Sequence, residues 1–195
     1  MNRHLIGSLV LLSAAMAAHG CFAADKLSVG DAAPQWTAIS GTDDKQHGLA
    51  DYKDAKALVV VFTCNHCPVA TAYQERLIAV QNDYKDKGVQ VIAICSNKGA
   101  ADDLDAMKKR AESAGFNFPY LFDSTQQVCH DYGAKCTPHA FVLDKDRKLA
   151  YVGAIDDDMH AEKVKKHYIR AALDAILDGK TPETATTQAF GCAIR

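Results

Sequence analysis

Two cysteines separated by two residues form the motif of this sequence best suited to chemistry. Cys64 and Cys67 lie in the run Cys64-Asn65-His66-Cys67-Pro68. The thiolate is the reactive form of cysteine, and two thiols at this spacing lie within disulfide reach when a helix begins at the motif. The pattern predicts thiol-disulfide exchange. The alternative is a pair of structural thiols or a static disulfide.

The elements around the motif are expected to activate its first sulfur. Residues 57–63 are a continuous β-prone apolar run, which is typical of a parallel strand covered on both faces. From residue 68 to about 87 apolar residues recur at helical spacing, and Gly88 ends the pattern. The helix dipole and free amides would favour a thiolate at the helix start. We therefore expect Cys64 to be the more exposed and more acidic thiol and to attack first.

His66 stands directly before the second cysteine. A partly cationic imidazole near a thiolate stabilises the reduced form, which makes the disulfide a stronger oxidant. His66 is therefore a candidate catalytic residue. The alternative is a solvent-facing histidine without a role.

The rest of the chain predicts an α/β fold with a mixed central sheet flanked by helices. Strand and helix patterns alternate after the motif, and a hairpin and a closing helix follow. The expected strands are residues 57–63, 89–95, 120–122, 139–143 and 149–153, and the expected helices are residues 68–87, 101–114, a short one ending at Gly133, and 164–177.

Four segments together resemble the redoxin family, which is thioredoxin-like and peroxiredoxin-like. They are residues 30–34, 62–68, 136–138 and 191–195. The resemblance implies a thioredoxin-like three-layer fold over residues 26–179. It is preceded by an N-terminal extension and followed by a C-terminal tail, residues 180–195, which carries Cys192.

The resemblance also implies roles. Cys64 would be the attacking thiolate and Cys67 the resolving thiol. Pro138 would follow a cis peptide bond, and Thr137 would present backbone groups to an extended substrate segment. The expected partners are a disulfide or dithiol protein substrate and a redox partner, and no cofactor is implied.

The sequence departs from the family in its proton acceptors and its peroxidase frame. Thioredoxins have a carboxylate six residues before the first cysteine and cytochrome-maturation reductases have one six residues after it, whereas this chain has Leu58 and Ala70. His66 or water would have to take the proton. The peroxiredoxin pattern P-x-x-x-T-x-x-C is absent before Cys64 and before Cys67. A peroxidase is therefore an alternative of lower rank.

Other thiols and imidazoles leave further alternatives open. Cys136 and Cys192 are candidate auxiliary thiols, either redox-active or structural, and Cys95 is expected to be a core residue. A C-x-x-C motif with nearby imidazoles also suits copper or zinc, although no metal is assigned. The histidines considered are His66, His130, His139 and His160.

The N-terminus predicts export. Arg3 and His4 precede an uncharged run, residues 5–18, that is shorter than the ~20 residues of a membrane span. Residues 1–23 are therefore expected to be a signal peptide that directs the chain to the periplasm or otherwise out of the cell, with Cys21 as a weaker candidate for a lipid anchor. The formal charge of -2 gives no indication of nucleic-acid binding.

Overall fold

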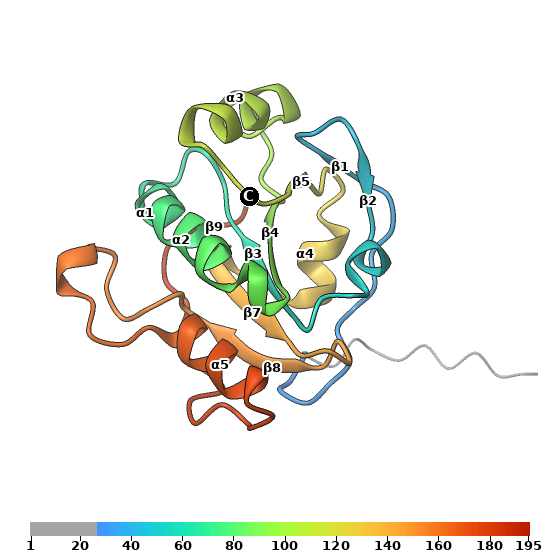
Figure 1. Cartoon of the computed structure of the whole chain (residues 1–195). Helices are drawn as coiled ribbons and strands as arrows, with labels where there is room; N and C mark the ends of the chain where they lie inside the picture. The colour runs from blue at the N-terminus through green and yellow to red at the C-terminus, as the bar shows by residue number, and fades with distance from the viewer. Residues whose placement is uncertain (1–26) are drawn as a thin grey trace, which may run out of the picture.

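The computed structural model of the chain describes residues 27–195 (Figure 1). The expected signal peptide, residues 1–23, and Cys21 lie outside them. In chain order the elements are β1 (Ile39–Gly41), β2 (Gln46–His47), η1 (Leu49–Tyr52), β3 (Ala57–Phe62), α1 (Pro68–Ala72), α2 (Gln74–Tyr84), η2 (Lys85–Lys87), β4 (Val89–Cys95), α3 (Leu104–Ala114), β5 (Tyr120–Phe122), α4 (Gln127–Tyr132), β6 (Cys136–Thr137), β7 (His139–Leu143), β8 (Leu149–Gly153), η3 (Ala161–Lys163), α5 (Tyr168–Leu177) and β9 (Cys192–Ala193).

A seven-stranded sheet forms the centre of the described chain, in the order β2-β1-β5-β4-β3-β7-β8. β3 pairs in parallel with β4, which pairs in parallel with β5, whereas β7 is antiparallel to β3. Every residue of β3 is buried, as expected for a strand that is covered on both faces. The predicted mixed sheet is confirmed.

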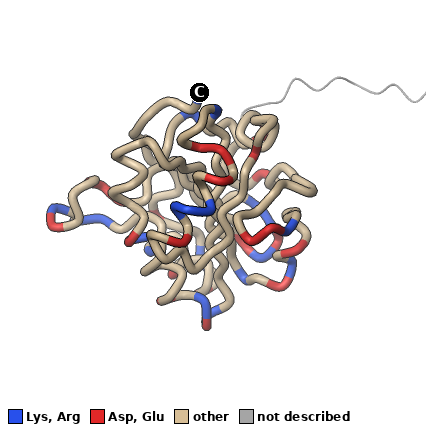
Figure 2. The backbone as a smooth tube through the Cα atoms, turned by 90° about the horizontal axis from the view of Figure 1, so that it is seen from above, with Lys and Arg blue, Asp and Glu red and all other residues tan. Residues whose placement is uncertain are grey.

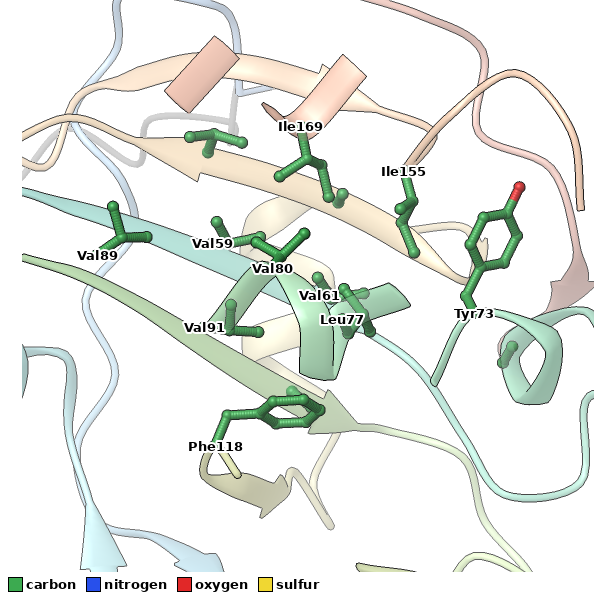
Figure 3. Close-up of a cluster of buried hydrophobic side chains, with 14 of the residues drawn as sticks. Val59, Val61, Tyr73, Leu77, Val80, Val89, Val91, Phe118, Ile155 and Ile169 are labelled. Atoms are coloured by element: carbon green, nitrogen blue, oxygen red, sulfur yellow. The ribbon is translucent and has the colours of Figure 1, made fainter. Parts of the chain in front are cut away.

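Helices cover both faces of this sheet. Successive β3 side chains point in opposite directions, so burying all of them requires a layer on each face. Val59 and Val61 pack toward α2 and α5, where Ile169 belongs to the same core (Figure 3). On the other face the ring of Phe62 lies 5.6 Å from that of Tyr132 in α4. The three layers predicted from the sequence are therefore present.

The helix expected over residues 68–87 is divided. α1 ends at Ala72 and α2 begins at Gln74, and Tyr73 between them donates its N–H to Ala70 O at 3.1 Å. This short i to i−3 bond tightens the helix end. The Tyr73 ring packs edge-on against Phe190 of the C-terminal tail. The closing helix likewise begins later than expected, at Tyr168.

The C-terminal tail follows the outer edge of β8 and then reaches the motif end of the sheet. Val152 of β8 donates to Ala185 O and accepts from Thr187 N, both at 3.0 Å. β9 then pairs antiparallel with β6 in a separate two-stranded sheet. Arg195 N donates to Asn97 Oδ1 at 2.7 Å, so the chain end lies against the loop after β4 (Figure 1).

Charged residues of both signs are interspersed around the described backbone (Figure 2). Among residues 27–195, no helix is long and apolar enough to cross a membrane.

Candidate active site

Cys64 and Cys67 lie in the loop that joins β3 to α1, with side chains 1% and 0% exposed. α1 begins at Pro68, a residue suited to the first helical position, and its N-cap is Cys67. Cys67 Sγ accepts the Ala70 N–H at 3.4 Å. Both thiols are buried, so exposure does not distinguish Cys64 as expected. The expectation that Cys64 occupies the helix start is wrong, because the chain turns for three more residues before the helix begins.

The loop before β7 contacts both sulfurs. The Thr137–Pro138 peptide bond is cis, as predicted. Thr137 Oγ1 lies 3.2 Å from Cys64 Sγ, and the Cys67 thiol donates to Thr137 O at 3.2 Å. Thr137 therefore contacts the thiols directly, and the docking of a substrate segment on its backbone stays a prediction.

The surroundings make Cys67, rather than Cys64, the more acidic thiol. At Cys64 burial raises the pKa, and a hydrogen bond with Thr137 only partly opposes it. Burial also acts to raise the pKa of Cys67. Hydrogen bonds from the Cys192 side chain and the Ala70 N–H outweigh it and hold the pKa below the ordinary value. The order of acidity is therefore the reverse of the predicted one, because the Cys192 side chain and the Ala70 N–H stabilise the Cys67 thiolate.

A buried carboxylate beside the motif was missed in the sequence. Asp102, 2% exposed, accepts the Asn65 N–H at 2.7 Å, and its other oxygen is hydrogen-bonded to His66 Nδ1. A sulfur of Cys64, a nitrogen of His66 and an oxygen of Asp102 all lie within 4.8 Å of one another. In the sequence Asp102 directly precedes Asp103, the N-cap of α3, so it reads there as part of an exposed helix start.

Comparison with known proteins agrees with this geometry. The model of the AhpC/TSA family matches residues 29–152. The chain belongs to the AhpC/TSA family. It is 28% identical over 144 residues to the thiol-disulfide oxidoreductase ResA of Geobacillus thermodenitrificans, covering 72% of this chain and 76% of that protein.

Two further proteins resemble this AhpC/TSA chain. Peroxiredoxin Bcp of Escherichia coli is 28% identical over 138 residues, which cover 65% of this chain and 85% of that protein. The crystal structure of an uncharacterized conserved protein from Geobacillus kaustophilus has a TM-score of 0.82 and 38% identity, covering 88% of this chain and 93% of that one. The fold is thioredoxin-like, as solved thioredoxin-domain structures show.

In the described part of this AhpC/TSA chain, one set of side chains could hold a metal ion. The set consists of Cys64, His66 and Asp102, whose ligand atoms lie close enough together within residues 27–195 to share an ion. His66 and Asp102 are bonded to each other. The other histidines considered, His130, His139 and His160, lie outside this group.

The remaining cysteines fall into two pairs. Cys192 is placed opposite Thr137 by the pairing of β9 with β6, and Cys136 is the neighbouring residue of β6. Cys95 and Cys129 are buried, which raises their pKa to about 12 and about 11. The structure therefore brings the two candidate auxiliary thiols to the site and leaves the other two in the core.

The first prediction concerns the order in which thiolates form. Hydrogen bonds to a thiolate stabilise the charged base, so the Cys67 thiolate should appear below its ordinary pKa of 9.0 as pH rises. Thiolate ultraviolet absorbance of the reduced protein measures this. We expect the low-pH step to persist in Cys64→Ser, to vanish in Cys67→Ser and to move to higher pH in Cys192→Ala. Loss of the step in Cys64→Ser alone would contradict the assignment.

Proposed function

We propose that this protein is an exported thiol-disulfide oxidoreductase whose Cys64 and Cys67 exchange a disulfide with protein substrates. The observation that carries the proposal is the contact of both sulfurs with Thr137 in the loop of the cis proline. The relative ResA is named a thiol-disulfide oxidoreductase, which supports the proposal. The leader composition of residues 1–23 supports export, and in an oxidising compartment such a disulfide persists.

The two thiols suit different steps of the exchange. A substrate disulfide would meet Cys64, whose raised pKa calls for a base. A nitrogen of His66 lies within 4.8 Å of Cys64 Sγ, so His66 would take the proton directly or through one water while Asp102 orients the imidazole. The Cys64 thiolate attacks one substrate sulfur and expels the other as a thiolate. The more acidic Cys67 then attacks Cys64 Sγ, which closes the Cys64–Cys67 disulfide and releases the second substrate thiolate.

A peroxidase remains the competing function because one relative is a peroxiredoxin. Peroxide needs a threonine three residues before the reactive cysteine, and Cys64 occupies that position before Cys67. A reactive thiolate without this frame oxidises slowly to a sulfenic acid. Disulfide exchange is therefore the function that the site favours.

The test is a stopped-flow comparison of the reduced protein with a disulfide peptide and with hydrogen peroxide. We expect the peptide to react faster and peptide mapping to find a Cys64–Cys67 disulfide in the product. A much faster reaction with peroxide would favour the peroxidase, and the absence of a Cys64–Cys67 disulfide would contradict the proposal.

A further inference from the structure

The C-terminal tail occupies the edge of the loop on which a substrate segment is expected to dock. β9 pairs antiparallel with β6, and the register places Cys192 opposite Thr137. A disulfide substrate in extended conformation would present its own cysteine in this way. In this structure the chain supplies both the docking edge and a strand that fills it.

A glycine allows this close approach. A Cβ atom at Gly191 would lie 2.0 Å from Thr137 O, and its φ of +147° is one that other residues rarely adopt. The tail is held on both sides of the glycine. The Phe190 ring packs against Tyr73, and Ile194 N donates to Lys135 O at 3.3 Å. The strand is therefore fixed in register at the motif.

The same pairing brings a third sulfur to the redox pair. The register places Cys192 opposite Thr137, the residue that contacts both Cys64 and Cys67, and Cys192 packs against the core cluster that contains both sulfurs. Cys192 is partly exposed, whereas Cys67 is 0% exposed. Cys192 is thus a partly exposed thiol packed beside the buried redox pair.

We propose that Cys192 is a third redox residue, which exchanges with the Cys64–Cys67 disulfide to form a Cys67–Cys192 disulfide; this rests on the proposed function. The Cys192 thiolate attacks Cys67 Sγ, the bond between Cys64 and Cys67 breaks, and Cys64 leaves as a thiolate that recovers the proton lost by Cys192. The number of disulfides is unchanged, so no further oxidant is required. In this second oxidised form the tail is covalently fixed across the substrate edge.

Peptide mapping of the oxidised full-length chain tests the proposal. The protein is oxidised with diamide and quenched in acid, its free thiols are alkylated, and its disulfides are mapped. We expect two disulfides in separate molecules of the wild type, Cys64–Cys67 and Cys67–Cys192. In Cys64→Ser nearly all molecules should carry Cys67–Cys192, and in Cys192→Ser nearly all should carry Cys64–Cys67.

Gly191→Ala separates the role of the tail from that of the sulfur. Its methyl group collides with Thr137 O, so we expect the Cys67–Cys192 disulfide to be lost while Cys64–Cys67 forms as before. The matched control is Gly179→Ala, which also has positive φ, +73°, but has no atom within 4 Å of an added Cβ. It should retain both disulfides.

The outcomes distinguish the two proposals. A Cys64→Ser variant that keeps Cys67 and Cys192 free after oxidation, beside a wild type that forms Cys64–Cys67, would overturn the role of Cys192 and leave the proposed function intact. A wild type without a Cys64–Cys67 disulfide would overturn the proposed function. If Gly191→Ala retains the Cys67–Cys192 disulfide, the register of β9 is not what brings the sulfurs together.

Discussion

Replacing Cys64 by serine should reduce exchange with a disulfide peptide by on the order of 10³-fold or more, the scale seen when a covalent nucleophile is removed. Serine does not form a disulfide, and the remaining thiol of the pair, Cys67, lies outside the group of Cys64, His66 and Asp102 that supplies the base. Cys67→Ser should instead keep the first step and stop there. The measurement is the single-turnover rate together with the mass of any trapped adduct.

The mixed disulfide identifies the attacking sulfur. With Cys67→Ser we expect the substrate to remain bound through Cys64. Cys129→Ser is the matched control, because Cys129 is also buried but lies in the core on the far side of the sheet, and it should exchange at the wild-type rate. Adducts mapped to Cys67 in Cys64→Ser, formed at the wild-type rate, would reverse the two roles.

Replacing Asp102 by alanine should slow the first exchange step about 100-fold near neutral pH, at the lower end of what a positioned acid or base contributes. The variant loses the group that orients His66 and also the acceptor for the Asn65 N–H. An unsatisfied buried amide lowers the free energy of unfolding by about 1–3 kcal/mol. Stopped-flow rates across pH and denaturant unfolding measure the two effects separately.

Two variants distinguish orientation of the imidazole from mere stability. Asp103→Ala removes the adjacent N-cap of α3, whose carboxylate accepts the Ala106 N–H at 2.8 Å, and should cost about 1 kcal/mol of stability without slowing exchange. His66→Ala should slow the first exchange step near neutral pH in the same way as Asp102→Ala, with the same dependence of the rate on pH. If Asp102→Ala is destabilised but exchanges at the wild-type rate across pH, Asp102 has a structural role alone.

The sequence predicts the framework of the site well because its signals are local. The apolar run before Cys64 and the helical spacing after Pro68 specify a strand and a helix that need no distant information. These local signals do not identify the residue that caps the helix. Helix boundaries depend on a few hydrogen bonds, and here the cap falls on Cys67. The Cys192 side chain and the Ala70 N–H together lower the pKa of Cys67, which reverses the expected order of acidity.

The partners of the motif that come from distant parts of the chain could not be predicted in this way. Asp102 reaches Asn65 across 37 positions of sequence, and no local pattern separates it from the other aspartates near the start of α3. The place of Cys192 depends on the pairing of β9 with β6, strands of two residues each. Such short strands have almost no pattern of their own.

The path of the tail along β8 has a consequence for solubility. β8 is the last strand of its sheet, and an uncovered edge strand offers free N–H and C=O groups to another chain. Ala185 and Thr187 occupy the outward groups of Val152, and Thr187 lies so close to Gly153 that a Cβ there would be 2.2 Å from its hydroxyl. The segment that carries Cys192 therefore also shields the sheet from edge-to-edge association. Loosening the tail to free the thiols would uncover an aggregation-prone edge at the same time.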